Sequence, residues 1–208
     1  NNSNEYFKKG IALTPVKFGI SFTATWYNQA GALLHLYTDG SIYLNHGGTE
    51  MGQGLHTKIM GIIAEEFDLP ISKIKISATD TSKVPNTSAT AASSGSDLNG
   101  MAVLNAINIL KARLAGVLYD SLGADKKSIQ YKSGFVVFDS GKLSFKALVK
   151  MAYEQRIQLS ASGFYKTPKI YWDRTKGQGR PFFYYSYGAA VAEVTVDGLT
   201  GESTVDRV

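Results

Sequence analysis

The sequence predicts an α+β fold in which a mixed β-sheet, built partly from β-hairpins, is covered by helices. Strand and helix patterns interleave along the chain, several strand patterns come in pairs joined by short turns, and no internal repeat or linker divides them. Frequent hairpins favour antiparallel pairs over a purely parallel sheet, which needs a crossover between neighbouring strands. With 208 residues, of which 44% are hydrophobic, the chain can form one large domain or two small ones.

The first part of the chain is predicted to be mainly β-structure. Residues 10–24 have the pattern of one long strand or of two consecutive strands, because Pro15 would remove a donor from the ladder. Residues 28–31 are expected to form a turn. An Asp-Gly pair separates residues 32–38 from residues 41–46 and predicts a hairpin turn in which both central residues have positive φ. The buried faces of this hairpin are expected to carry Leu34, Leu36, Ile42 and Leu44.

Two helical patterns and one strand pattern follow. Apolar residues recur at helical spacing over residues 55–67, and Pro70 ends the pattern. Residues 71–80 alternate with period two, which predicts a strand. Residues 103–117 again show helical spacing. Because Leu104 and Ile109 fall outside the apolar stripe, we expect this helix to be covered on more than one side.

The last part of the chain returns to strands. Residues 128–138 and 141–145 are predicted to form a hairpin, and residues 145–156 an amphipathic helix. Residues 163–180 are polar and contain proline and glycine, so an irregular exposed excursion is expected there. Residues 182–197 are predicted to be a final strand. The chain begins without Met and stops inside a further alternating pattern, which predicts a segment cut from a longer protein.

Composition excludes several kinds of site. The chain has no Cys, which excludes disulfides, Cys-ligated zinc and iron–sulfur clusters held by this chain. The net charge is +5, but the basic residues are scattered, so nucleic-acid binding is disfavoured although it stays a rival hypothesis. No apolar run approaches the roughly 18 residues that a bilayer requires, and the sequence contains no signal-peptide pattern. We therefore expect a cytoplasmic protein with neither a nucleic acid nor a membrane as its partner.

Two loops rich in small residues precede the predicted helices and are the best candidates for a functional site. In the segment GGTEMGQG (residues 47–54), four of eight residues are glycine, and the loop leads into a helix N-terminus, where free backbone N–H groups bind anions. Gln53 adds an amide that can donate and accept. The alternative is a tight turn that merely needs glycine. Neither a Walker loop nor a GxGxxG fingerprint fits this segment.

The second loop, residues 86–100, has the same character. Its run of small residues would let a ligand lie against the main chain, its serine hydroxyls are candidate donors, and Ser96 or Asp97 could cap the following helix. The alternative is a flexible linker. That alternative is less attractive because a second loop of matching chemistry precedes another helix.

Other constellations are weaker. His46, Glu50 and His56 could be drawn as a metal triad, but their spacing crosses a strand, a loop and a helix, so structural histidines are the better interpretation. Phe22 and Trp26 could wall a pocket, although core packing is the simpler expectation.

Two long motifs resemble the molybdopterin-binding part of xanthine dehydrogenases. They are HGGTEMGQGLHTK (residues 46–58) and VPNTSATAASSGSDLNG (residues 84–100), and residues 19–24, 28–42, 162–168 and 185–201 resemble the same family in the same order. The resemblance implies the α+β fold of the molybdenum cofactor-binding domain of the xanthine dehydrogenase and aldehyde oxidase type. It also implies that residues 1–208 are part of that domain, truncated at both ends.

The resemblance carries specific residues. It implies contacts to the pterin and its phosphate from nine positions: Met51, Gly52, Gln53, Gly54, Thr90, Ala91, Ala92, Ser93 and Ser94. It implies that Phe22 and Thr23 bind the substrate, with the Phe22 ring lying against a purine. The family position that matches Gly95 is commonly serine, so the resemblance implies that one hydrogen bond to the pterin is missing here. Trp26-Tyr27 replaces a more usual Phe-Leu, which leaves the shape of the substrate channel open.

The resemblance also implies a function for the complete protein. The parent enzyme would hydroxylate a purine (xanthine or hypoxanthine) with oxygen from water and pass electrons to 2Fe-2S and FAD centres in other domains or subunits. Its partners would be the purine and the rest of the molybdenum subunit. The GFGGKE and VGEPPL-like motifs of the family are absent, so no catalytic residue and no metal ligand is expected here, and the segment alone is expected to be inactive. The alternatives are an aldehyde-oxidase-like enzyme and a non-catalytic module that binds a phosphate-bearing cofactor.

Overall fold

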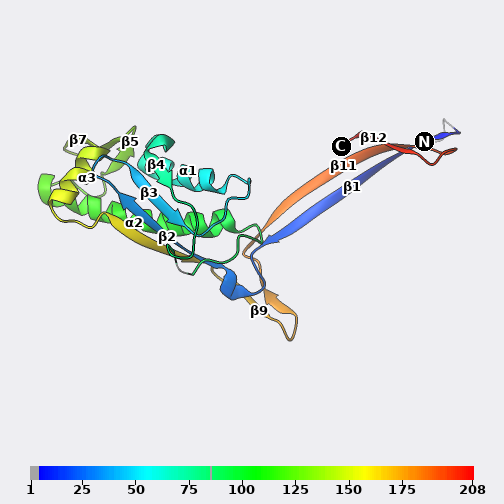
Figure 1. Cartoon of the computed structure of the whole chain (residues 1–208), viewed down its shortest axis with the longest axis horizontal. Coiled ribbons are helices and arrows are strands. Elements are labelled where there is room, and N and C mark those ends of the chain that lie inside the picture. The colour runs from blue at the N-terminus through cyan, green and yellow to red at the C-terminus, as the bar shows by residue number, and fades with distance from the viewer. Residues whose placement is uncertain (1–4, 85) are drawn as a thin grey trace. The chain divides into compact units, whose positions relative to one another are not determined.

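The computed structural model describes residues 5–84 and 86–208. The predicted domain, residues 1–208, therefore includes residues 1–4 and Pro85, which lie outside the described residues. The chain divides into two units, Ser21–Pro181 on the one hand and Asn1–Ile20 with Phe182–Val208 on the other. Figure 1 colours the chain from the N-terminus to the C-terminus and labels the elements.

The larger unit is built on a four-stranded mixed sheet with the order β4-β3-β2-β8. Strand β2 (Gln29–Leu36) pairs antiparallel with β3 (Ile42–His46) and with β8 (Ser160–Lys166), whereas β4 (Ile74–Ile76) runs parallel to β3. The prediction of an α+β fold with a mixed sheet is confirmed. The hairpin of β2 and β3 is also confirmed, and its four expected apolar residues are buried.

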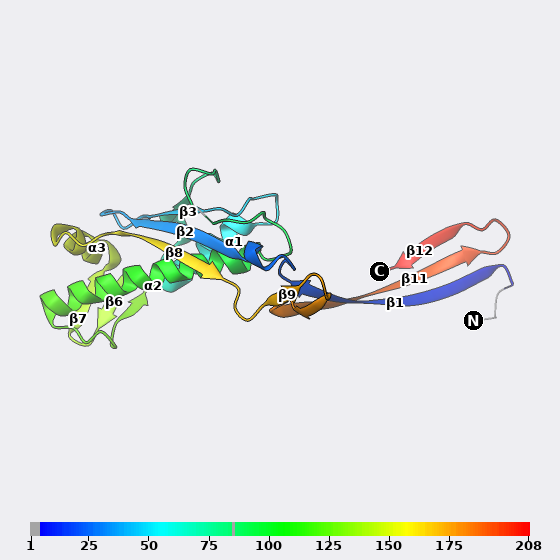
Figure 2. The same ribbon diagram turned by 90° about the horizontal axis from the view of Figure 1, so that it is seen from below.

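Helices α1 (Leu55–Phe67) and α2 (Gly95–Leu122) pack against this sheet, and α3 (Phe145–Glu154) packs against α2. Figure 2 shows α2 running along β2 and β8. The approach is close, because a Cβ atom at Gly163 of β8 would lie 1.9 Å from the carbonyl oxygen of Ala102. The buried core joins sheet and helices through Leu34, Leu44, Leu55, Ile59, Ile63, Phe67, Ile107, Leu110, Leu114 and Phe145.

Helix α2 starts eight residues before the apolar pattern that predicted it. Of the two residues that suggested cover on more than one side, Leu104 is half-buried, but Ile109 is 40% exposed, so the expectation is wrong at Ile109. Within the described residues, α2 is also long and apolar enough to cross a membrane by length and composition alone. Buried core helices pass the same test, and α2 packs along β2, β8 and α1.

The turn between β2 and β3 differs from the expected one. Gly40 has a φ of 81°, but Asp39 does not have positive φ. The Gly40 N–H donates to the Tyr37 carbonyl oxygen at 2.8 Å, and the Tyr37 N–H donates to Ser41 at 2.9 Å. This is a three-residue turn that ends in a left-handed glycine, the next most common hairpin connection.

Several predicted boundaries in the larger unit are wrong. The turn expected at residues 28–31 lies earlier, as the 3-10 helix η1 (Thr25–Tyr27), because Asn28 folds back on Phe22 and Thr25 and lets β2 begin at Gln29. The strand expected at residues 71–80 is shortened to β4 by the 3-10 helix η2 (Ile71–Lys73).

The C-terminal part of the larger unit contains two small sheets. The predicted hairpin of residues 128–138 and 141–145 is confirmed in part. Strands β6 (Phe135–Phe138) and β7 (Gly141–Ser144) pair as expected, but a turn at Ser133 and Gly134 divides the expected first strand into β5 (Gln130–Lys132) and β6. The excursion expected at residues 163–180 is instead the end of β8 followed by a hairpin, which consists of β9 (Tyr171–Asp173) and β10 (Gln178–Arg180).

The smaller unit is one three-stranded antiparallel sheet of β1 (Phe7–Ile20), β11 (Tyr184–Asp197) and β12 (Ser203–Arg207). Figure 1 shows β1 and β11 side by side along their length. Strand β1 continues through Pro15, so the expected interruption is absent. This is possible because β1 is an edge strand, which pairs on one side only, and proline is tolerated in edge strands although it has no N–H to donate.

Candidate functional site

The two loops that precede α1 and α2 meet in the structure. The Thr49 N–H in the first loop donates to the Thr90 hydroxyl oxygen in the second at 2.8 Å. A Cβ atom at Gly47 would lie 2.1 Å from the Thr87 methyl carbon, so only glycine lets the loops approach this closely. The loops that sequence reasoning singled out separately therefore form one structural feature.

A cavity of about 450 Å³ opens between these loops. The residues that line it come from the ends of both loops and from the first turns of α1 and α2: Met51, Gln53, Leu55, Lys58, Thr90, Ala91, Ala92, Ser93, Gly95 and Ser96. Six of the nine positions implied for the cofactor are among them. Gly52, Gly54 and Ser94 do not line the cavity. Lys58 carries the only charge in this lining of described residues.

The first loop is held in shape by its own acidic residue. One oxygen of the Glu50 carboxylate accepts hydrogen bonds from the N–H groups of Gly52 at 2.9 Å and Gly54 at 3.0 Å, and the other accepts from His56 at 3.0 Å. These bonds, the one from His56 above all, lower the pKa of Glu50. The expectation that the α1 N-terminus offers free N–H groups to an external anion is therefore wrong for these three donors, because Glu50 already fills them.

Gln53 and its glycine neighbours complete the first loop. The Gln53 side chain accepts a hydrogen bond from the Met51 N–H at 2.6 Å and donates one to the Thr49 carbonyl oxygen at 2.9 Å. Gly52 and Gly54 have φ values of 97° and 75°, a region that L-residues seldom adopt, so glycine is needed for the backbone path. The loop is thus pre-formed by contacts within residues 49–56.

The second loop is shaped by an unusual turn. Ala92 and Ser93 have φ values of 53° and 56°, and the Ser94 N–H donates to the Ala91 carbonyl oxygen at 3.3 Å. Two consecutive left-handed residues make a type I′ turn, which glycine and asparagine favour. Ser94 is the N-cap residue of α2, so the prediction that Ser96 or Asp97 caps this helix is wrong. The Ser94 hydroxyl donates to Ala91 at 3.1 Å.

His46 lies behind the first loop and is 3% exposed. Its Nδ1 accepts a hydrogen bond from the Gly48 N–H at 3.0 Å, so the ring is neutral with its proton on Nε2. Burial, and then the nearby His56, lower the pKa of His46 to about 4. In the described residues no group of three or more His, Cys, Asp or Glu, His46, Glu50 and His56 included, is placed to hold a metal.

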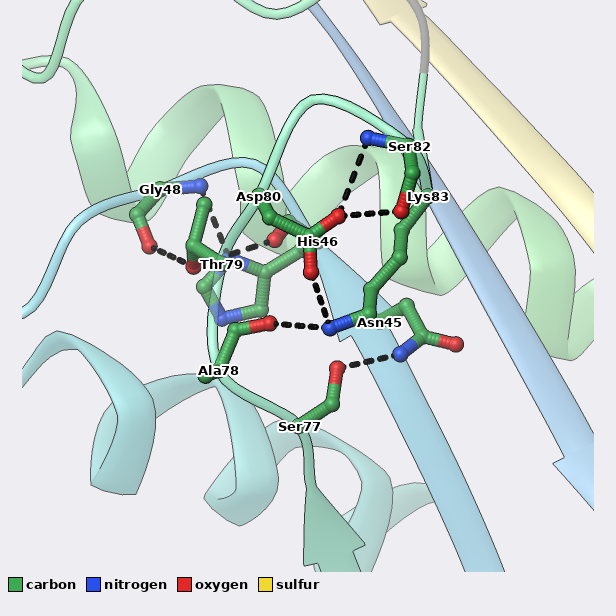
Figure 3. Close-up of polar contacts among 9 residues, drawn as sticks. All are labelled: Asn45, His46, Gly48, Ser77, Ala78, Thr79, Asp80, Ser82 and Lys83. Atoms are coloured by element: carbon green, nitrogen blue, oxygen red, sulfur yellow. Dashed lines mark hydrogen bonds and ion pairs between the residues drawn. The ribbon is translucent and has the colours of Figure 1, made fainter.

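Figure 3 shows a polar network in which residues 77–83, the segment after β4, contact the end of β3 and the start of the first loop. The Thr79 hydroxyl donates to the Gly48 carbonyl oxygen at 3.0 Å, and the Asn45 amide donates to the Ser77 hydroxyl. The Lys83 ammonium bonds the Ala78 carbonyl oxygen at 2.7 Å and pairs with Asp80 at 2.5 Å. Sequence reasoning missed this network. The only signal for it was the change at Ile76 from alternation to a run of Ser, Thr and Asp.

Phe22 and Thr23, the positions implied for the substrate, do not line this cavity. They lie in a separate tight segment, where the Asn28 amide accepts from the Phe22 N–H at 2.7 Å and donates to its carbonyl oxygen at 2.9 Å. The Phe22 ring is half-buried and packs edge-on against Tyr27 with 5.5 Å between the ring centroids. Their substrate role stays a prediction.

Comparisons with known proteins agree on one family. The model of the molybdopterin cofactor-binding domain matches residues 1–208. The chain is 49% identical to xanthine dehydrogenase of Oryza sativa subsp. japonica over 211 residues, which is 100% of this chain and 14% of that relative. It is 47% identical to aldehyde oxidase 2 of Macaca fascicularis, over 97% of this chain and 14% of that relative. The chain thus spans about one seventh of the length of these relatives.

Solved structures show the same fold. The Cu,Mo-CO dehydrogenase matches 97% of this chain and 25% of its own with a TM-score of 0.76 at 19% identity. The aldehyde oxidoreductase from Desulfovibrio desulfuricans matches 99% and 20% with a TM-score of 0.73 at 22% identity. The family model and the relatives that cover the chain from end to end lead to one conclusion: this chain belongs to the molybdopterin cofactor-binding domains of the xanthine dehydrogenase and aldehyde oxidase family.

Proposed function

We propose that this chain binds molybdopterin in the cavity between its two loops and serves as part of the molybdenum subunit of a hydroxylase. The observation that carries the proposal is the junction of the loops, where Thr49 and Thr90 are hydrogen bonded at the rim of a cavity of about 450 Å³. That volume falls in the range of ordinary cofactor pockets.

The donors in the cavity suit a phosphate-bearing pterin. Lys58 supplies a positive charge, and the hydroxyls of Ser93 and Ser96 can donate to phosphate or carbonyl oxygens. Met51 and Leu55 supply apolar surface for a flat ring. We assign cofactor binding to the nine positions carried by the resemblance. Gly52 and Gly54 act through the path of the backbone, and Ser94 acts by closing the turn. When bound, the cofactor supplies the molybdenum chemistry, and these residues hold and orient it.

The chain is proposed to work only inside a larger protein. The sheet of β1, β11 and β12 exposes apolar side chains on both faces: Ile11 and Leu13, which are 68% and 65% exposed, lie on one face, and Val16 and Phe18 lie on the other. A sheet that is apolar on both sides is normally covered on both sides. We propose the rest of the molybdenum subunit as that cover.

The substrate and the electron path are part of the same proposal. We propose that the parent enzyme hydroxylates a purine with oxygen from water and passes electrons to 2Fe-2S and FAD centres held elsewhere, in the cytoplasm. An aldehyde is the second candidate substrate, because the identity to an aldehyde oxidase is as high as that to most of the xanthine dehydrogenases. No base for proton abstraction has been assigned in this chain, so the chain alone is proposed to be inactive.

The proposal is tested by measuring molybdopterin directly. The parent protein is denatured, and the released pterin is quantified by fluorescence and the molybdenum by mass spectrometry. Gln53→Ala is expected to lower both, because the Gln53 amide ties Met51 to Thr49 and lines the cavity. Gln130→Ala, at an exposed position of β5, is the matched control and should leave both unchanged. Full pterin and molybdenum in Gln53→Ala would contradict the assignment.

A further inference from the structure

We propose that β11 accepts one more strand on its free edge, next to β12, and that this strand comes from the part of the parent protein outside this chain. The inference rests on the proposal that the chain works inside a larger protein. It goes beyond that proposal because it concerns the edge of the sheet rather than its two faces, and because it specifies the kind of segment that binds there.

The direction of the free edge follows from the register of the sheet. The Gly198 N–H donates to the Tyr6 carbonyl oxygen at 2.6 Å, and the same register continues without a shift along β1 and β11. In an antiparallel pair, residues that exchange both backbone bonds alternate with residues that exchange none. Four odd-numbered residues of β11 therefore point their N–H and C=O groups away from β1: Tyr185, Tyr187, Ala189 and Val191.

Strand β12 covers only part of this side of β11. It pairs with residues 193–196, and the register shifts at Glu193, where the pairing ends. Within residues 5–84 and 86–208, no other strand pairs with β11 on this side, and the backbone groups of residues 185–191 have no partner besides β1. This segment of β11 thus presents a row of unpaired donors and acceptors, which is a template for another strand.

The edge of the larger sheet at β8 is different, because side chains of α2 cap it. The Arg113 guanidinium donates to the outward carbonyl oxygen of Ser160 at 2.7 Å. The Asn105 amide donates to the outward carbonyl oxygen of Phe164, also at 2.7 Å. Acceptors that are already used by the chain itself offer less to an incoming strand. The edge at β8 is therefore protected against pairing.

The outer edge of β1 is protected in another way. Pro15 lies opposite Ala189, so by the register of the sheet its backbone points outward, where it has no N–H to offer. Proline and charged residues are the usual means of keeping an edge strand unpaired. Residues 185–191 of β11 contain neither. Of the three edges compared, only this one lacks protection, and we take it as the edge that pairs.

The occupant is a strand of the parent protein. This chain corresponds to 14% of the length of its relative from Oryza sativa subsp. japonica, so most of a parent of that length lies outside it. Strand β12 already runs antiparallel to β11 on this side, and an antiparallel strand in line with β12 would continue the existing sheet. One face of β11 carries only small side chains at Gly188, Ala190 and Ala192, which leaves room for large apolar side chains of an uncharged partner strand.

Amide hydrogen exchange of the full-length parent protein tests the pairing, with single residues read by mass spectrometry after electron-transfer fragmentation. We expect the outward amides of Tyr187, Ala189 and Val191 to exchange within roughly tenfold of the inward amides of Gly188 and Ala190, which bond to β1. Outward amides that exchange faster than that would mean that the edge is free, and would overturn the inference.

Two variants separate strand pairing from simple burial of the edge. Ala189→Pro deletes one outward N–H, whereas Ala189→Val keeps it and favours a strand. We expect Ala189→Pro to unfold at a lower temperature and to speed exchange at Tyr187 and Val191 by roughly tenfold or more, and Ala189→Val to do neither. An Ala189→Pro protein that behaves like wild type would overturn the pairing, since proline would then be tolerated as Pro15 is in β1. If Ala189→Pro does not fold, the exchange of the wild-type protein decides.

The remaining outcomes concern other occupants and the proposed function. Protection that disappears when the parent protein is diluted to a monomer would assign the edge to a second copy and would overturn the inference. Neither measurement requires the cofactor, so both are repeated on protein from a host that cannot synthesise molybdopterin. A parent protein that never contains pterin but keeps the protection would contradict the proposed cofactor binding and leave this inference standing.

Discussion

The two loops that enter α1 and α2 look alike in sequence but differ in how their polar groups are satisfied. The first loop is closed on itself, since Glu50 and Gln53 bond its backbone at five points. The second has two left-handed residues, and the N–H groups of Ala92 and Ser93 are unused within the described residues. A glycine-rich helix entry is therefore not in itself an anion site, because a side chain of the same chain can occupy the donors first.

The largest expected effect is on the free energy of unfolding and comes from protonating His46. This side chain bonds the backbone of the first loop at Gly48 and makes no contact of this kind with the second loop. The lowered pKa means that the unfolded chain binds a proton at His46 between pH 6.5 and about 4, whereas the folded chain does not. The contribution of His46 to stability is therefore constant above pH 6.5 and falls as the pH drops through this window. The difference corresponds to about 3 kcal/mol by pH 4.

Urea unfolding of the parent protein from pH 7 to pH 4.5 measures this effect. His46→Asn places an amide oxygen near the position of Nδ1 and should remove the part of the pH dependence that belongs to His46. Equal pH dependence in wild type and His46→Asn would show that His46 is not the titrating group.

The next effect comes from separating the two loops. Gly47→Ala would place a methyl group against the Thr87 side chain, at 2.1 to 2.4 Å from three of its atoms. Overpacking of this kind costs typically about 1 to 3 kcal/mol. We expect a lower unfolding midpoint and loss of bound molybdopterin together. Gly61→Ala, inside α1 where a Cβ atom meets nothing within 4 Å, is the control. It should not lower the unfolding midpoint, because alanine favours the helix more than glycine does, and it should leave bound molybdopterin unchanged. Full cofactor content in Gly47→Ala would show that the junction of the loops is dispensable.

The smallest expected effect is on amide hydrogen exchange in the first loop, and it tests whether the Glu50 carboxylate holds that loop closed. Glu50→Gln keeps the size of the side chain but leaves one oxygen for three N–H donors. Amide hydrogen exchange of Gly52, Gly54 and His56 should become faster in the cofactor-free protein. Glu65→Gln, at an exposed position on α1, removes the same charge and should leave these amides unaffected. Unchanged exchange in Glu50→Gln would mean that the loop is held by other contacts.

Sequence patterns predicted the elements that bury regular apolar stripes. The hairpin of β2 and β3 and the helix α1 are where the patterns placed them, because Leu34, Leu44, Ile59 and Ile63 must all reach one core. The two loops were recognised from their small residues and their place before helices.

Patterns failed where a single polar contact decides the outcome. Hydrogen bonds of the Asn28 amide to Phe22 and Thr25 place the turn at Thr25–Tyr27 instead of at residues 28–31. The Glu50 carboxylate accepts backbone N–H groups at the start of α1 that were expected to be free. Neither contact has a periodic signal, since each depends on one side chain meeting one stretch of backbone. Strand β1 continues through Pro15 because it lies at an edge, and edge position is a property of the sheet that the strand sequence does not contain.

The most direct test of the central claim is to fill the cavity between the loops and measure molybdopterin. Ala91→Trp places an indole in the cavity. Because Ala91 is exposed, the larger side chain should not clash with the buried core, and the protein should still fold. Ala112→Trp, on the exposed side of α2, is the matched control. We predict that wild type and Ala112→Trp release equal amounts of pterin on denaturation and that Ala91→Trp releases little. Equal release from all three proteins would contradict the claim that this cavity holds the cofactor.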